Sequence, residues 1–134
     1  MRMWLLLAGI NGAMAVAAGA YAAHGLTEAG PQAIHWMSLA STYQLIHATA
    51  LGVVGTLTPI LRAGGGGLAR ILNFAAGGLM TAGIVLFCGA LYGLALDVAW
   101  LMPGTAPVGG FAFMAGWLSL AGAGVASKAK AVEK

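Results

Sequence analysis

Charged side chains are scarce in this sequence, and acidic ones most of all. Of the 134 residues, 7% are charged, and Glu28, Asp97 and Glu133 are the only acids. A soluble domain typically carries about 25% charged residues, whereas this chain is 60% hydrophobic and has a mean hydropathy of +0.91. The deficit excludes an ordinary soluble domain and indicates a protein whose solvent is lipid.

The missing charges also exclude several kinds of function. The six basic residues are scattered around the apolar segments instead of lying on one face, so no nucleic-acid partner is expected. No carboxylate lies inside a long apolar run, which argues against acid–base catalysis in the membrane and against a small proton-coupled exporter. The single cysteine, Cys88, excludes an intrachain disulfide, and its apolar surroundings indicate an unreactive, packed thiol.

Four apolar runs are present, and each is long enough to cross a membrane. At about 1.5 Å per residue, roughly 20 helical residues span the hydrocarbon core. We expect spans at about residues 3–24, 36–61, 71–96 and 107–126, all within one domain covering residues 1–134. The sequence therefore predicts an all-α fold, an integral membrane four-helix bundle.

The first run also has features of a secretory signal. Arg2 precedes the apolar stretch, which ends in Ala20-Tyr21-Ala22, a pattern typical of a cleavage site. Removing this segment would leave an odd number of spans and disrupt the charge pattern described next. We therefore expect a retained membrane helix.

Basic residues mark one side of the membrane. Arg2 precedes the first span, Arg62 and Arg70 lie between the second and third, and Lys128, Lys130 and Lys134 follow the fourth. The other two connections contain no Lys or Arg. By the positive-inside rule, we expect a multi-pass protein of the inner (plasma) membrane with both termini in the cytoplasm.

Residues at the ends of the runs indicate how the spans are connected. Gly25 is expected to end the first helix in the left-handed conformation. The connection from Arg62 to Arg70 contains Gly64 to Gly67 and is expected to be a flexible turn. Thr105 is expected to cap the fourth helix, and Pro107 to lie in its first turn.

Small residues form a stripe along the first span. They recur every three or four residues and so share one helical face: Ala8, Gly12, Ala15, Gly19 and Ala22. Such a stripe allows another helix to approach closely. The pair Gly89 and Gly93 is less informative, because this spacing arises by chance in a chain with 22 glycines.

Three polar side chains interrupt the second span near its middle. Tyr43 and Gln44 lie four and three residues before His47, so the three share a helical surface. An unpaired polar group at this depth costs several kcal/mol, roughly. Two interpretations stay open: a polar site for a lipid headgroup, a quinone or a proton relay, or hydrogen bonds between helices. In the second, a neutral His47 bonds to Tyr43, Gln44, Asn11 or a backbone carbonyl.

Two further polar residues belong to this candidate site. Asn11 is the other deep polar group, and we expect it to hydrogen-bond to the second helix, the alternative being its own helix or water. His24, at the end of the first span, is either a titratable surface group or a cap of the turn. His24, His35 and His47 lack the close spacing of a metal site, and His24 and His47 differ too much in depth for haem, so no metal or cofactor is expected.

Four sequence blocks occur in order along nearly the whole chain. They are Gly19-Ala-Tyr-Ala-Ala-His24-Gly-Leu, Tyr43-Gln-Leu-Ile-His47-Ala, Leu86-Phe-Cys-Gly-Ala-Leu-Tyr92 and Thr105-Ala-Pro107-Val-Gly-Gly110. The set resembles the small bacterial inner-membrane proteins of the YgdD/YwdK type, the family of domain of unknown function 423, which has mitochondrial relatives. Cys88 stands where that resemblance implies a serine. The resemblance implies a four-helix membrane protein and brings no activity, substrate or cofactor.

Two classes of function remain. The short loops, the absence of a soluble domain and the small-residue stripes favour a non-enzymatic accessory or interaction subunit of a larger membrane complex or homo-oligomer. The alternative is a protein that binds or transports a lipid, quinone or small solute at the polar site around His47. Membrane lipids are expected partners in either case.

Overall fold

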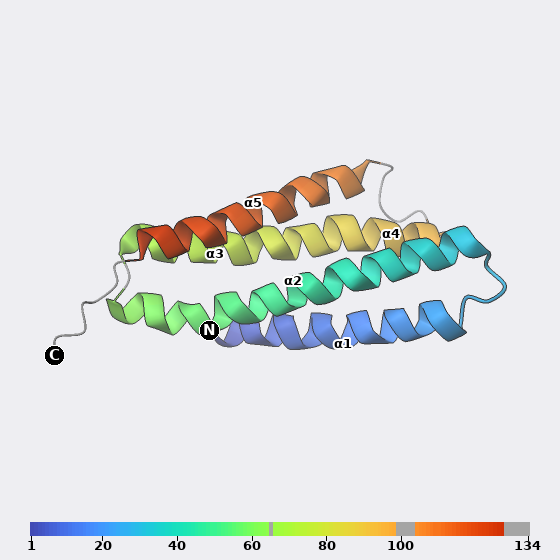
Figure 1. Cartoon of the computed structure of the whole chain (residues 1–134), viewed down its shortest axis with the longest axis horizontal. Coiled ribbons are helices and arrows are strands. Elements are labelled where there is room, and N and C mark those ends of the chain that lie inside the picture. The colour runs from blue at the N-terminus through green and yellow to red at the C-terminus, as the bar shows by residue number, and fades with distance from the viewer. Residues whose placement is uncertain (65, 99–103, 128–134) are drawn as a thin grey trace.

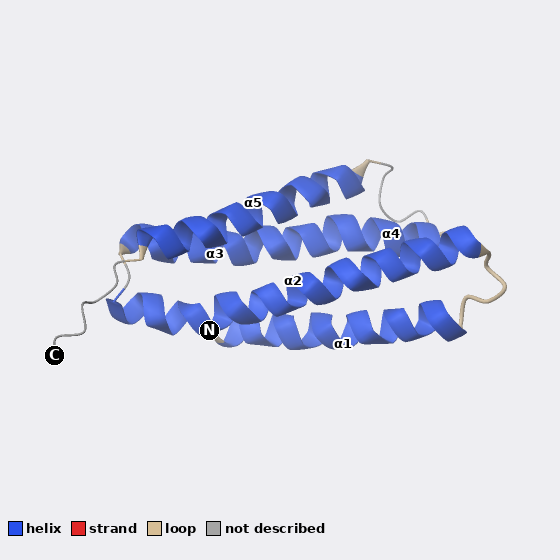
Figure 2. Ribbon diagram, viewed as in Figure 1, coloured by secondary structure: helices blue, strands red, loops and turns tan. Residues whose placement is uncertain are grey.

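The computed structural model describes residues 1–64, 66–98 and 104–127, and these are almost entirely helical. Its elements are α1 (Arg2–His24), α2 (Pro31–Gly64), α3 (Gly67–Gly83), the π-helical segment η1 (Ile84–Cys88), α4 (Gly89–Ala95) and α5 (Thr105–Ala126). Because α3, η1 and α4 form one continuous rod, the described residues contain four helices long and apolar enough to cross a membrane. Figure 2 shows this all-helical architecture, which confirms the predicted fold class.

The four rods form two hairpins packed side by side. Helix α1 packs along α2, α5 packs along α3, and α2 contacts the rod formed by α3, η1 and α4. Helices α1 and α5 therefore flank the molecule, while α2 lies inside it with neighbours on two sides (Figure 1). The rod formed by α3, η1 and α4 is likewise internal, so the polar residues of α2 can meet α1 on one side and the rod on the other.

The predicted small-residue stripe of α1 forms much of its contact with α2. Ala15 and Ala22 are buried, and the hydroxyl of Ser41 on α2 donates to the carbonyl of Ala15 at 2.8 Å. A Cβ atom added to Gly19 would lie 2.9 Å from the Ser41 hydroxyl, whereas one added to Gly12 would meet nothing within 4 Å. The absence of a side chain at Gly19 thus lets the two helices approach, as small residues do in membrane helices.

Helix α5 approaches the π-helical segment even more closely. A Cβ atom added to Gly109 would overlap the backbone and side chain of Phe87, and one added to Gly83 would overlap the ring of Phe113. A π-helical turn is rare and usually accommodates an extra residue within an α-helix. Here it lies at the point where α5 crosses the rod, next to the aromatic residues of the candidate site.

The prediction that Gly25 adopts the left-handed conformation is wrong. Its φ is −100°, and the left-handed glycine of this connection is Gly30, at φ 86°. The amides of Gly25 and Leu26 both donate to the carbonyl of Tyr21, at 2.7 and 3.2 Å. A Cβ atom at Gly25 would overlap the ring of Tyr21 where it lies in the structure, so this glycine leaves room for the ring and does not supply a positive φ.

Two other predicted helix ends also differ from the structure. Helix α2 continues through Arg62 to Gly64 and α3 begins at Gly67, so Arg62 and Arg70 lie in helices and not in a flexible turn. The N-cap of α5 is Gly104, at φ 102°, which makes Thr105 the first helical residue instead of the cap. A left-handed residue at this point favours glycine, because glycine has no Cβ to clash.

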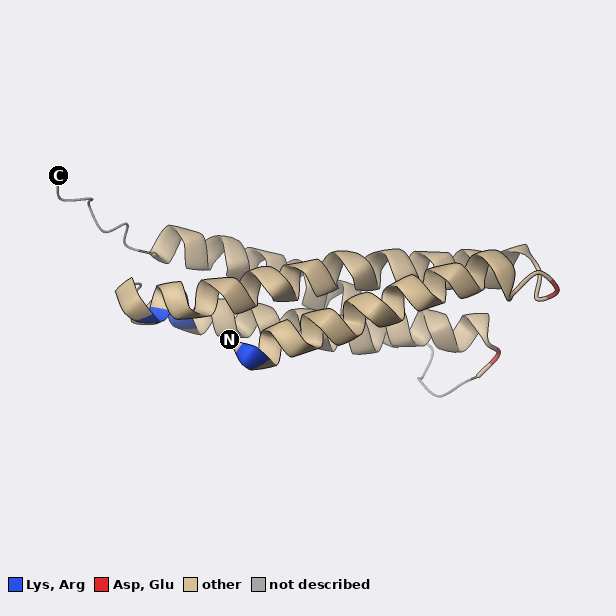
Figure 3. Cartoon of the chain, turned by 90° about the horizontal axis from the view of Figure 1, so that it is seen from below, with Lys and Arg blue, Asp and Glu red and all other residues tan. Residues whose placement is uncertain are grey.

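Charged residues separate to the two ends of the molecule, as Figure 3 shows. Arg2, Arg62 and Arg70 lie at one end, here called the basic end, and Glu28 and Asp97 lie at the other. Lys128, Lys130, Lys134 and Glu133 of the predicted charge pattern lie outside the described residues. Which end faces the cytoplasm stays a prediction.

Candidate functional site

A chain of hydrogen bonds joins three helices at Gln44, which is 2% exposed. The hydroxyl of Tyr92 on α4 donates to Oε1 of Gln44 at 2.6 Å. Nε2 of Gln44 donates to Oδ1 of Asn11 on α1 at 2.9 Å, and Nδ2 of Asn11 donates to the carbonyl of Leu7 at 2.9 Å. We call Tyr92, Gln44 and Asn11 the Gln44 network.

The Gln44 network leaves few polar groups unsatisfied in an apolar environment. Asn11 makes both bonds considered for it, one across to α2 and one within its own helix. Tyr92 donates to Gln44, Gln44 donates to Asn11, and Asn11 donates to a backbone carbonyl. The amide orientations of Gln44 and Asn11 are therefore mutually consistent. Such bonds hold helices together in lipid, where the hydrophobic effect provides no attraction between them.

His47 belongs to a second group, between α2 and α5. Its Nδ1 lies 2.7 Å from the carbonyl of Tyr43, and the indole of Trp117 donates to its Nε2 at 3.2 Å. A carbonyl only accepts and an indole only donates, so the ring is neutral with its hydrogen on Nδ1. Its face stacks on Phe113, with ring centroids 3.5 Å apart. Both nitrogens are therefore occupied by bonds within the protein.

The structure divides the predicted cluster in two. Gln44 meets partners on α1 and α4, whereas His47 meets partners on α5. The ring of Tyr43 packs against Phe87 with centroids 4.7 Å apart, and only the backbone carbonyl of Tyr43 bonds to His47. The reason is the central place of α2, which presents neighbouring residues of one face to different helices.

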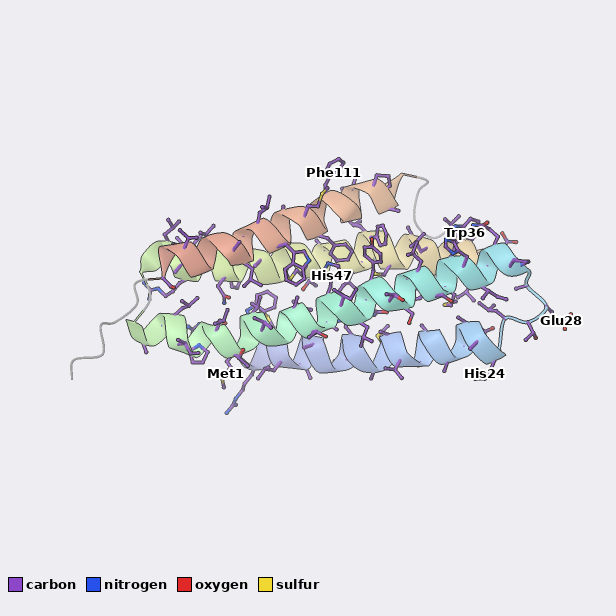
Figure 4. The ribbon with its side chains drawn as sticks, in the orientation of Figure 1. Met1, His24, Glu28, Trp36, His47 and Phe111 are labelled. Carbon is purple, nitrogen blue, oxygen red and sulfur yellow. The ribbon has the colours of Figure 1, made fainter. Side chains whose placement is uncertain are left out.

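His24 belongs to neither group. It lies exposed in the last turn of α1, while His47 lies in the middle of the molecule (Figure 4). The structure thus separates His24 from the four other residues predicted to form the site. Within the described residues, no three His, Cys, Asp or Glu side chains gather where they could hold a metal ion.

A shallow groove of about 550 Å³ lies beside His47 on the surface of the bundle. Rings from α2, η1 and α5 line it, among them Tyr43, Phe87, Phe113 and Trp117. We call it the aromatic groove. Its polar atoms at His47 are already bonded, so it offers a ligand mainly flat apolar surfaces.

Three polar residues with well-defined partners were not predicted. Asn73, on α3, is 3% exposed and donates to the carbonyl of Val54 and to Thr58 Oγ1, both at 3.2 Å. The same argument that selected Asn11, an amide within an apolar run, could have found it. Tyr92 and Trp117 carry donors that seek partners when buried, but the sequence does not show which helix supplies them.

Residues 18–110 match the family described as "Protein of unknown function (DUF423)". The chain belongs to this family. The match confirms the resemblance drawn from the four sequence blocks, and it covers Gln44, His47, Asn73 and Tyr92 of this DUF423 protein.

Relatives in the DUF423 family cover nearly the whole chain. The UPF0382 membrane protein YwdK of Bacillus subtilis (strain 168) is 36% identical over 126 residues, which are 93% of this chain and 98% of the relative. UPF0382 membrane proteins of Staphylococcus aureus (strain bovine RF122 / ET3-1) and Staphylococcus epidermidis (strain ATCC 35984) are 36% and 37% identical over 123 residues, 90% of this chain and 93% of each relative. No solved structure matches the chain. The names agree with a membrane protein and state no activity.

Proposed function

We propose that this protein is a non-enzymatic accessory subunit of the inner membrane that associates with another transmembrane helix through the outward face of α1. The bonds around Gln44 and His47 support a structural role for the polar residues. Their donors and acceptors pair α2 with α1, α4 and α5 inside the chain. The chemistry of the mid-membrane region therefore serves cohesion of the bundle.

The observation that carries the proposal is a second small-residue stripe on α1. It lies on the side away from α2 and consists of exposed residues three or four positions apart: Gly9, Ala13, Ala17 and Ala20. A Cβ atom at Gly9 would meet nothing within 4 Å. In membrane helices such stripes let the backbone of another helix approach closely. The first stripe of α1 does this for α2, and the second is available to a partner.

Cross-linking from single cysteines tests this role. Native Cys88 is 1% exposed, so it contributes little background. We expect Ala13→Cys, on the second stripe, to give a discrete adduct on irradiation in native membranes after labelling with a benzophenone maleimide, which needs no thiol on the partner. Mass spectrometry of the adduct would distinguish a second copy from a different protein.

Met14→Cys is the matched control, because Met14 is also exposed on α1 but lies about 100° around the helix. Equal adducts at the two positions would indicate random collisions. The absence of an adduct from Ala13→Cys would contradict the proposed contact.

A second candidate function rests on the aromatic groove. Its volume of about 550 Å³ and its rings suit a flat apolar ligand such as a quinone. We expect a short-chain quinone to quench the fluorescence of Trp117 saturably, and Trp117→Phe to remove the saturable part. Quenching that rises linearly with concentration, with no difference between the two proteins, would exclude a quinone site.

A further inference from the structure

A cavity of about 650 Å³ opens at the basic end of the bundle, away from both groups described above. Residues of α1, α2 and α3 line it, including Arg62, Arg70, Asn73 and Trp4. Neither of the proposed functions uses it. Its lining combines positive charge, a buried amide and apolar rings, and each part restricts what it can bind.

The charge favours an anion. Arg62 lies in the last turn of α2 and Arg70 in the first turn of α3, and both side chains line the cavity. Among the described lining residues there is no acid, and the acids that the structure describes, Glu28 and Asp97, lie at the opposite end (Figure 3). Guanidinium groups bind phosphate oxygens through paired hydrogen bonds. An anion between the two arginines would also relieve their mutual repulsion.

The buried amide of Asn73 adds a requirement for a hydrogen-bond donor. Its Nδ2 donates to the carbonyl of Val54 and to Thr58 Oγ1, which identifies the other amide atom as oxygen. This Oδ1 is buried and has no hydrogen-bond partner among the residues that the structure describes. A buried acceptor without a donor is unfavourable, so a ligand with a hydroxyl group fits this wall.

The remaining wall is apolar and leads toward the lipid. Trp4 is 5% exposed and packs edge-on against Phe74, with ring centroids 5.5 Å apart. A Cβ atom at Gly77 would lie 2.7 Å from the Trp4 ring, so glycine makes room for it. Phe74 itself is 63% exposed on the bundle surface. The cavity is thus polar at the helix ends and apolar toward the spans, which matches a lipid better than a free anion.

We propose that this cavity binds the headgroup of an anionic phospholipid that carries a hydroxyl group, as a phosphoglycerol headgroup does. Arg62 and Arg70 contact the phosphate, and Asn73 Oδ1 accepts a hydrogen bond from the hydroxyl. Basic pockets between membrane helices bind anionic headgroups in this way. The inference goes beyond the proposed function, because the outward face of α1 takes no part in it.

Native mass spectrometry of the detergent-purified protein, titrated with phosphatidylglycerol or phosphatidylcholine, tests the site. We expect one phosphatidylglycerol to bind and phosphatidylcholine not to bind. Each arginine near a headgroup contributes a factor of about 5, so Arg62→Gln and Arg70→Gln should each raise the apparent Kd about 5-fold, and the double variant about 30-fold. Both side chains are exposed, so these variants should fold.

Arg2→Gln is the matched control, because Arg2 lies at the same end but does not line the cavity. Its Kd should change by less than about 2-fold. An equal loss in Arg2→Gln would show general charge attraction and overturn the site, as would equal binding of the two lipids.

Two further ligands separate the chemical sources. Phosphatidylmethanol has the same charge but no hydroxyl. We expect it to bind about 3-fold more weakly than phosphatidylglycerol, which corresponds to one hydrogen bond in a membrane protein. Equal binding of the two lipids would contradict the proposed hydrogen bond from the headgroup to Asn73 Oδ1. Glycerol 3-phosphate supplies the headgroup without acyl chains and should not compete at the lipid's concentration. Competition at equal concentration would show that a soluble phosphate ester, and not a lipid, is the ligand.

Discussion

The bond from Tyr92 to Gln44 offers the sharpest test of the bundle, because it joins two rods through a single hydroxyl. Tyr92→Phe removes that hydroxyl with little change in shape and leaves Gln44 Oε1 without a donor. Hydrogen bonds between membrane helices contribute about 0.6 kcal/mol on average and at most about 1.7. The distance of 2.6 Å is short for a bond of this kind. We therefore expect a loss near the upper limit, about 1–1.7 kcal/mol in the free energy of unfolding.

Gln44→Leu should cost more, because it breaks two bonds at once. Asn11 Oδ1 loses its donor and the Tyr92 hydroxyl loses its acceptor. Two such bonds amount to about 1–3 kcal/mol. The double variant, Tyr92→Phe with Gln44→Leu, has no Tyr92 hydroxyl to leave without an acceptor. Its loss in free energy of unfolding should therefore be smaller than the sum of the two single losses by about 1–1.7 kcal/mol.

Reversible unfolding in bicelles, followed by circular dichroism, measures all four proteins of this cycle. The control cycle pairs Tyr92→Phe with Ser119→Ala, because the Ser119 hydroxyl donates to the carbonyl of Ala115 within its own helix. The control losses should add. If the losses of Tyr92→Phe and Gln44→Leu also add, to within about 0.5 kcal/mol, the two side chains do not interact in the membrane and the Gln44 network is wrong.

Two more predictions concern packing. Gly109→Ala should destabilise the protein by about 1–3 kcal/mol, because the new Cβ would overlap Phe87. The control, Gly110→Ala, places a Cβ that meets nothing within 4 Å and should be neutral or slightly stabilising. Equal free energies of unfolding for the two variants would contradict the close contact of α5 with η1. Cys88, 1% exposed between the helices, should react with a membrane-permeant maleimide only after unfolding, and labelling of the intact protein within minutes would show that its surroundings are open.

The sequence predicts which amide side chains need partners, but not which helix supplies the partner. Asn11 and Gln44 were predicted because an amide in an apolar run needs a partner wherever the helix lies. Asn73 follows from the same rule, because it is an amide within the third apolar run, but it was not predicted. Tyr92 and Trp117 are different, since a phenol or indole in a membrane helix has several possible partners. Only the arrangement of the helices shows that Tyr92 serves Gln44 and Trp117 serves His47.

The ends of the helices were also predicted only in part from the sequence. Gly25 was predicted to have a positive φ at the end of α1, and this is wrong: its φ is −100°, and its missing side chain leaves room for the ring of Tyr21. The polyglycine connection was predicted to be a flexible turn, yet α2 continues to Gly64. In both cases the glycines marked a helix end, but the conformation there depended on a neighbouring side chain or on the continuation of the helix.

The sequence by itself determined that this protein is a set of four apolar helices with charged ends. In lipid every backbone group must be bonded within the segment, so length and hydropathy are sufficient to identify a helix. The tertiary structure decided which side chains meet. Hydrogen bonds near 3 Å depend on how each helix is rotated about its axis, and that rotation is determined by close contacts such as those at Gly109 and Gly83. For this reason one predicted cluster around His47 became two groups that face different helices, and a separate basic cavity appeared at the end of the bundle.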